Sequence, residues 1–318
     1  MTTDSASVAR RQVRPVAASL FMLAACTCFA LNSVLVRHVA DTDDLHPFQI
    51  AFFRNAFALV FILPWVLRSG ILDVLRPRRF GLLSLRGLLN SLSMLTWFMA
   101  VPLMPLADLT ALGFTAPLWA TVLAAIALGE RVRARRWTAT AIGFLGALVI
   151  VRPGFEAVGP GVYLILFSSA MWAATIVTVR MLTASERPEA ILFWQAVMMT
   201  GFALVPSLFV WEWPAWHTLP WLLALGLLAF LAHVFHIRAY SMQEVAALQP
   251  IDFSRLPIVA AVAWMVFGQV VDVWTWIGGA IVFAAGTYIA HREARLKRAA
   301  VAAAASSAPG RAPTIGPS

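Results

Sequence analysis

The sequence predicts an all-α integral membrane protein whose ten transmembrane helices form two inverted five-helix repeats. Of the 318 residues, 61% are hydrophobic and only 12% are charged, whereas a soluble domain is about half apolar and a quarter charged. Apolar runs of about 20 residues, enough to cross a bilayer, recur along nearly the whole chain. A stretch of the second half also repeats the first.

The apolar runs are expected to be helices, because lipid cannot satisfy a lone backbone amide and no alternating strand pattern is present. In chain order the spans cover residues 17–39, 47–67, 80–101, 105–128, 137–151, 161–182, 190–211, 219–241, 245–267 and 273–290. The predicted organisation is an N-terminal segment (1–16), a first repeat (17–151), a linker (152–160), a second repeat (161–290) and a basic, then disordered tail (291–318).

Basic residues in the loops predict the orientation of the chain. Arginines precede the first span and follow the second, fourth, sixth and tenth, while alternate loops such as DTDDLH and EWPAWHTLP contain neither Lys nor Arg. The positive-inside rule therefore predicts that both termini are cytoplasmic. The expected location is the inner membrane of the cell. The net charge of +9 is a sign of this topology and not of nucleic-acid binding.

The internal repeat appears when the chain is shifted by 139 residues, which lays 86–144 over 225–283 with fifteen identities in 59 positions. About five would be expected by chance in so Ala- and Leu-rich a chain. The pairs include Gly87 with Gly226 and Phe114 with Phe253. Five spans is an odd number, so the second copy enters the membrane from the opposite side, as in secondary transporters with a site near the midplane.

The strongest candidate site is LQPIDFSRLP, residues 248–257, which places Gln249, Asp252 and Arg255 on one side of a helix at i, i+3 and i+6. A charge facing lipid at the bilayer centre would cost about 2.5–3.5 kcal/mol, so these side chains should face the interior. Two interpretations are compatible. The acid and the guanidinium line a hydrated substrate cavity, or they pair with each other and lock the helix.

The same stretch predicts a local unwinding of the helix. Pro250 and Pro257 remove two amide donors, which would leave carbonyl oxygens free to line a wet cavity. The aligned positions of the first repeat are all small: Thr110, Gly113 and Ala116. One copy therefore presents a polar ridge where the other presents a groove.

Six further residues are candidates for the substrate pocket, and each has a structural alternative. His233 and His236 suit hydrogen bonding or proton handling better than metal binding, since no third ligand accompanies them. Arg54 is either a site residue or an interfacial anchor. The remaining candidates are polar or aromatic side chains at interior-facing positions: Asn90, Trp97 and Trp172. The two tryptophans either pack in the core or stack on an aromatic or heterocyclic ligand. No metal or cofactor is expected. Cys26 and Cys28 point apart on one helix and are interpreted as inert apolar filler.

Several motifs resemble the EamA-type transporters of the drug/metabolite transporter superfamily. PLADLTALGFTAPLWATVLAAIALGERV (105–132) is similar to the fourth span of that family, ending in the pair Gly129–Glu130, with IVRPG following at 150–154. FFRNAFALV and MWAATIVTVR are also similar to family patterns. The sequence departs from them at Phe29, often Trp, and at Gln269, often Glu, so a helix-capping role suits Glu130 better than a transport role. The resemblance implies substrates such as amino acids, nucleosides, riboflavin, S-adenosylmethionine or drug-like cations.

The predicted function is secondary transport of a small polar organic metabolite, such as an amino acid, a nucleoside or a flavin, by alternating access, as export or exchange. No P-loop is present, so a coupling proton or an exchanged solute would supply the energy. Arg255 would bind a carboxylate or phosphate, Trp97 would stack on a ring, and Asp252 would bind an amine or carry the proton. The alternatives are an integral-membrane enzyme, for which the sequence lacks a convergent catalytic set, and a passive pore.

Overall fold

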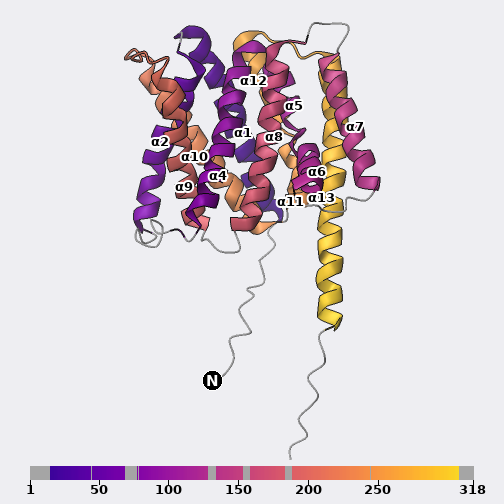
Figure 1. The fold of residues 1–318 in the computed structure, drawn as a ribbon. Coiled ribbons are helices and arrows are strands. Elements are labelled where there is room, and N and C mark those ends of the chain that lie inside the picture. Colours follow the sequence, from indigo (N-terminus) through magenta and orange to yellow (C-terminus); the bar gives the residue numbers. More distant parts are fainter. Residues whose placement is uncertain are drawn as a thin grey trace, which may run out of the picture.

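The helices of the protein run side by side in one bundle (Figure 1). The computed structural model describes residues 15–43, 45–68, 77, 79–127, 134–152, 158–182, 188–243 and 245–307. These residues form helices and connecting turns, with no strand among them. The elements are α1 (Pro15–Thr42), α2 (Pro47–Arg68), α4 (Phe80–Ala100), the 3-10 helix η1 (Val101–Leu103), α5 (Leu106–Gly113), α6 (Ala116–Ala127), α7 (Ala134–Val151), α8 (Pro160–Leu182), α9 (Pro188–Leu208), α10 (Leu219–Met242), α11 (Val245–Asp252), α12 (Arg255–Phe267) and α13 (Val273–Ser307).

The helices have the length and the surface of a membrane protein. Seven helical stretches within the described ranges are long and apolar enough to cross a bilayer, and two shorter apolar helices lie at 160–175 and 193–208. Large apolar side chains such as Val60, Leu145 and Val266 are exposed on the outside, while Arg54 and Arg86 are buried inside. A soluble protein has the opposite distribution, so this chain is an all-helical membrane protein.

The spans expected at 105–128 and 245–267 are each two helices. This corrects the prediction of one continuous helix at 105–128 and confirms the local unwinding predicted for residues 248–257. The first is interrupted at Phe114–Thr115, between α5 and α6, and the second at Phe253–Ser254, between α11 and α12. Each break lies just before a proline, Pro117 or Pro257, whose missing amide and bulky ring disfavour a helix at the carbonyl four residues earlier. Arg255 therefore begins a new helix and does not continue the face of α11.

Unwinding occurs at only one of the two prolines of the second break. Pro250 lies inside α11. Its missing amide would have bonded to Ala246, in the first turn of that helix, where loss of one hydrogen bond is readily tolerated. Pro257 affects the carbonyl of Phe253, and there Leu256 donates its amide to Phe253 over a shorter turn, at 3.0 Å.

Helix packing follows the same pattern in both halves of the chain. α1 packs along α10 as α8 packs along α4, and α2 packs on α10 as α9 packs on α4. Two aligned glycines make such contacts possible. A Cβ atom on Gly87 would lie 2.5 Å from Cβ of Met198 in α9, and one on Gly226 would lie 2.5 Å from Cβ of Phe57 in α2. Only glycine allows the backbones to approach this closely.

Candidate functional site

A cavity of about 330 Å³ lies between α2, α9 and α10. This volume is within the range of pockets that bind small organic molecules. Most of the lining is apolar, including Met199 and Phe230. The polar side chains are few and come from all three helices: Arg54, Asn55, Gln195, His233 and Arg238. A small solute could therefore be held by burial of its apolar surface and oriented by a few hydrogen bonds.

Arg54 is buried at the wall of this cavity and is held by neutral partners. Its Nε donates to Oδ1 of Asn32 at 3.2 Å, and its Nη1 donates to Oδ1 of Asn55 at 3.1 Å. The two amides are themselves oriented by backbone carbonyls, because Asn32 donates to Leu225 at 3.1 Å and Asn55 donates to Ala51 at 2.9 Å. These partners are neutral amides, so they hold the guanidinium in place without compensating its charge.

Arg86 supplies a second buried guanidinium that the sequence analysis did not select. Its Nη2 donates to Oε1 of Gln195 at 2.6 Å, and its Nε is buried without a hydrogen-bond partner. Gln195 itself lines the cavity. The signal that could have identified Arg86 is the one that identified Arg54, an arginine inside an apolar run, which is expensive unless it faces the interior.

The two predicted histidines both lie on α10, and one of them lines the cavity. His233 lines the cavity, and its Nδ1 is 2.7 Å from the carbonyl oxygen of Ala229. Since a carbonyl only accepts, Nδ1 carries a proton. The rings of His233 and His236 both meet the ring of Phe29 edge to face, at 5.7 and 5.9 Å. Among the described residues, no group of three His, Cys, Asp or Glu side chains could hold a metal ion.

Asp252 and Arg255 bind each other across the break between α11 and α12. Arg255 Nη2 lies 2.5 Å from Asp252 Oδ1. The thiol of Cys26 lies 3.6 Å from the same carboxylate oxygen, so this cysteine is a polar neighbour and not the apolar filler expected. Neither member of the ion pair is among the residues that line the cavity, which separates two groups that the sequence analysis had placed together.

One aromatic ring connects the cavity with the ion pair. Phe29 of α1 touches His233, which lines the cavity, and the guanidinium of Arg255 lies over the same ring, 5.1 Å from its centre. The same guanidinium also lies over the ring of Phe114, in the break of the first half, 5.6 Å from its centre. A cation over ring faces is favoured by the aromatic quadrupoles. A shift of Phe29 would therefore change the contacts of both His233 at the cavity and Arg255 in the ion pair.

The other predicted site residues have different surroundings. Asn90 is buried and donates to Sδ of Met199, a residue that lines the cavity, at 3.1 Å. Trp97 is partly buried and packs against Phe98 at 5.4 Å between ring centres. Trp172 is 39% exposed on α8. The side chain of Gln249 lies outside the part of the chain that the structure describes, so its role stays a prediction.

Comparison with known proteins places the chain among transporters. The EamA-like transporter family matches it twice, at residues 16–152 and 159–290. A riboflavin transporter of Rhizobium johnstonii is 31% identical over 299 residues, covering 93% of this chain and 98% of the relative. A riboflavin transporter of Vibrio cholerae is 30% identical, covering 89% and 96%. An S-adenosylmethionine uptake transporter of Rickettsia felis is 28% identical, covering 82% and 88%.

The fold is also found among solved structures. One crystal structure matches with a TM-score of 0.58 at 16% identity, covering 87% of this chain and 96% of that one. At this identity the likeness concerns the fold alone. The repeated family match, the relatives at 30% identity or more and the interior cavity together lead to one conclusion: the chain belongs to the EamA-like transporter family and is a transporter of a small metabolite.

Proposed function

We propose that the protein is a secondary transporter of a flavin, such as riboflavin, and that the cavity between α2, α9 and α10 is its binding site. The observation that carries the proposal is the chemistry of the cavity wall. Its described lining offers the polar groups of Arg54, Asn55, Gln195, His233 and Arg238 on a mainly apolar surface and contains no carboxylate. Such a wall suits a large, flat, uncharged solute with hydrogen-bond acceptors on one edge.

Riboflavin fits this wall better than S-adenosylmethionine, although relatives named for each solute exist. The isoalloxazine ring of riboflavin presents carbonyl oxygens and ring nitrogens as acceptors and has no net charge. S-adenosylmethionine carries a sulfonium cation, which the buried charges of Arg54 and Arg86 would repel in a medium of low dielectric constant. The wall therefore favours the neutral solute.

The proposed architecture is ten spans in two inverted repeats, at 17–151 and 161–290, with the linker 152–160 between them. The matching helix pairs and the aligned pair Gly87 and Gly226 support it. Loop charges favour an inner membrane location with the N-terminal segment 1–16 and the tail 291–318 in the cytoplasm. Under this orientation the cavity extends from Arg54 towards Arg238, that is, towards the cytoplasmic ends of α2 and α10.

Asp252 and Arg255 are proposed to couple the transport cycle and not to hold the flavin directly. Their link to the cavity is Phe29, which contacts His233 on one side and Arg255 on the other. Protonation of Asp252 would release Arg255 and allow Phe29 to move. The energy source is then a proton gradient or an exchanged solute. Catalysis and a passive pore are both less well supported, because the relatives are named transporters.

The test is flavin counterflow in proteoliposomes of the purified protein, together with thermal shift in detergent. Riboflavin should raise the apparent Tm and S-adenosylmethionine should not, because only a ligand of the folded state stabilises it. Arg54→Gln should weaken riboflavin binding about ten- to hundredfold, as expected for lost hydrogen bonds to a charged donor. Ala58→Phe, which fills the cavity from another residue, should also abolish uptake.

The matched control is Arg295→Gln, which removes an exposed arginine in the C-terminal half of α13. It should leave both binding and uptake unchanged. Wild-type riboflavin uptake by Arg54→Gln and Ala58→Phe would contradict the assignment of the cavity. A thermal shift with S-adenosylmethionine but not with riboflavin would contradict the assignment of the solute and leave the cavity in place.

A further inference from the structure

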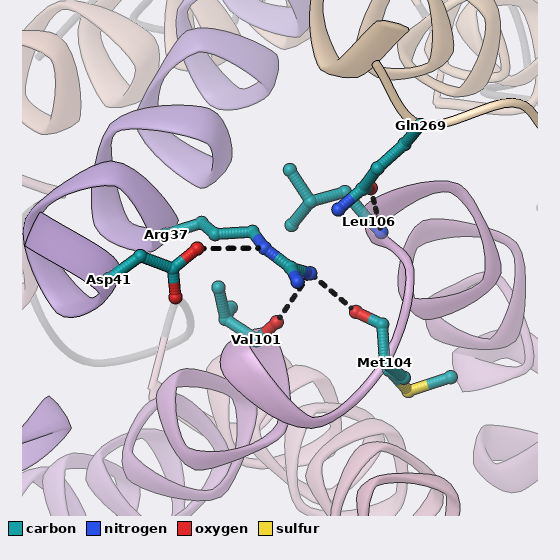
Figure 2. Close-up of polar contacts among 6 residues, drawn as sticks. All are labelled: Arg37, Asp41, Val101, Met104, Leu106 and Gln269. Atoms are coloured by element: carbon teal, nitrogen blue, oxygen red, sulfur yellow. Dashed lines mark hydrogen bonds and ion pairs between the residues drawn. The ribbon is translucent and has the colours of Figure 1, made fainter. Parts of the chain in front are cut away.

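One end of the bundle is joined by a set of polar contacts that surrounds Arg37, near the C-terminal end of α1 (Figure 2). Its Nη1 donates to the carbonyl oxygens of Val101 and Met104, at 3.2 and 2.9 Å. Its Nε binds Asp41 at 3.3 Å. The two carbonyls belong to η1 and the turn after it, where helix α4 has ended and carbonyls lack helical partners. A single side chain thus joins α1 to the connection between α4 and α5.

The second contact of this set crosses between the halves of the chain. Oε1 of Gln269 accepts a hydrogen bond at 3.3 Å from the amide of Leu106, the first residue of α5 (Figure 2). Pro105, which precedes it, supplies no side-chain cap, so Gln269 satisfies an amide that would otherwise lack a partner. Gly268 has a φ of 65°, which only glycine adopts readily, and this turn aims Gln269 back at α5. Arg37 also lies over Phe267, one residue earlier, at 5.8 Å.

The cavity lies away from this end. α1 ends at Thr42 and α2 begins at Pro47, so the start of α2 is at the same end as Arg37. The cavity begins at Arg54, two turns further, and continues to Ile62 on α2. On α10 it extends to Arg238, near the far end of that helix. The contacts of Arg37 and Gln269 therefore lie closer than the cavity to that end of the bundle.

We propose that Arg37 and Gln269 form a gate, the outer latch, which is closed in this structure and must open to give the cavity access to the outer side. The outer latch is defined by Arg37 with Val101 and Met104, and by Gln269 with Leu106. The partners of these two side chains are backbone groups at or next to helix ends: the carbonyl oxygens of Val101 and Met104 and the amide of Leu106. Water can replace such partners when the elements separate, since Arg37 already has 17% of its side chain exposed. The latch is therefore reversible.

The repeat provides a natural comparison for this gate. The end of the first span, CFALNSVLVR (28–37), aligns with MWAATIVTVR (171–180) in the second half. Arg180 of α8 is therefore the sequence counterpart of Arg37. In an inverted repeat, a residue aligned with one at the outer end belongs to the inner end. Loss of Arg37 should then favour opening to the outside, and loss of Arg180 should not. The inference rests on transport by alternating access and is independent of the identity of the solute.

The experiment measures the separation across the latch with spin labels at two exposed positions, Leu103→Cys in η1 and Val270→Cys after Gln269. Both are placed in a Cys26→Ala, Cys28→Ala background of the full-length protein in nanodiscs. Pulsed dipolar spectroscopy should show one dominant short distance without solute. Arg37→Gln should shift a large fraction of the molecules to a longer distance, and Gln269→Ala should do the same to a smaller extent.

Arg180→Gln and the surface variant Arg295→Gln are the matched controls, and neither should lengthen the distance. Flavin counterflow provides a second readout, because a molecule biased to one side should lose net exchange while keeping solute binding. An unchanged distance distribution in both Arg37→Gln and Gln269→Ala would overturn the proposal. A longer distance in Arg37→Gln with no riboflavin transport in the wild type would uphold the latch and reject the proposed solute.

Discussion

Two spans of this protein are each interrupted at the same aligned position, but the side chains at the two breaks differ in chemistry. Phe114–Thr115 separates α5 from α6, and Phe253–Ser254 separates α11 from α12. The two breaks lie at aligned positions of the repeat. In the first break, Thr115 donates its hydroxyl to the carbonyl oxygen of Leu112, at 2.7 Å. In the second, Asp252 and Arg255 form an ion pair. The break is thus a property of the repeated fold, whereas the charge pair is an addition to one copy.

The two breaks also meet each other. The rings of Phe114 and Phe253 have their centres 5.3 Å apart, and Arg255 lies over Phe114. One break therefore supplies an aromatic face and the other supplies the charge that lies on it. This difference teaches that duplicated halves can keep one architecture while a few substitutions give only one of them a titratable centre. The predictions that follow test how far the equivalence of the halves extends.

The largest expected effect is the loss of one member of the ion pair. Arg255→Ala leaves the carboxylate of Asp252 buried without its partner and should destabilise the protein by about 3–5 kcal/mol, as measured by thermal unfolding in detergent. The double variant Asp252→Ala, Arg255→Ala should recover much of this loss. Thr110→Ala, in the aligned region of the first half, should change stability little. Equal losses in the single and double variants would show that the pair does not act as a pair.

The same ion pair should matter for transport. Asp252→Asn keeps the shape of the side chain but removes its charge, so we expect normal insertion into the membrane with abolished or uncoupled transport. The measurement is pH-driven uptake compared with counterflow in proteoliposomes. Wild-type rates in both assays would refute a coupling role for Asp252.

The second expected effect concerns the aligned glycines. Gly226→Ala places a Cβ 2.5 Å from Cβ of Phe57 and 3.0 Å from the backbone nitrogen of Ala58, and Gly87→Ala places one 2.5 Å from Cβ of Met198. Overpacking of this kind costs about 1–3 kcal/mol, and Gly226 should be the worse site because backbone atoms cannot move aside. Gly201→Ala has open space and serves as the control. Equal stability of all three variants would contradict the close packing of both halves.

A smaller effect is expected where the two breaks touch. A double-mutant cycle of Phe114→Leu and Phe253→Leu should give a coupling energy of about 0.5–1.5 kcal/mol, as for other aromatic pairs. The free energy of unfolding in a detergent titration is the measurement. Strict additivity would mean that the rings do not interact in the membrane-embedded protein.

The smallest effect is expected at an exposed ion pair. Asp41 pairs with Arg37 at i+4, but its side chain is 46% exposed, so Asp41→Asn should alter stability by only about 0.2–1 kcal/mol. Added salt should reduce that difference further. The carboxylate of Asp252 is less exposed, at 14%, and its partner Arg255 also lies over the rings of Phe29 and Phe114. A loss as large as that of Arg255→Ala would contradict this account.

Several features could be predicted from the sequence because they depend on short-range pattern. Apolar runs predicted the helices, and the shift of 139 residues predicted that Gly87 and Gly226 are equivalent. The double break was predicted only in part. Pro257 indicated unwinding in the second copy, but Pro117 in the first copy was not recognised as its counterpart, because the two prolines occupy adjacent and not identical positions of the alignment.

The membership of the candidate site could not be predicted in the same way. Arg86 forms a hydrogen bond with Gln195, 109 residues away in the chain, and Asn32 forms one with Leu225, 193 residues away. Sequence periodicity does not predict contacts between residues so far apart. The sequence analysis placed Asp252 and His233 in one pocket. In the structure His233 lines the cavity, whereas Asp252 binds Arg255 outside it. Phe29 contacts both His233 and Arg255.

Residence in the membrane and the repeated order of helices follow from composition and spacing, since lipid requires long apolar segments with satisfied backbones. Tertiary packing alone decides which buried charge obtains which partner. Arg54 and Arg255 are both arginines within apolar segments, yet they have different partners. Arg54 is held by two asparagines at a cavity wall, whereas Arg255 binds a carboxylate and lies over two aromatic rings. The free energy of a buried charge depends on groups brought to it from distant helices, and local sequence does not contain that information.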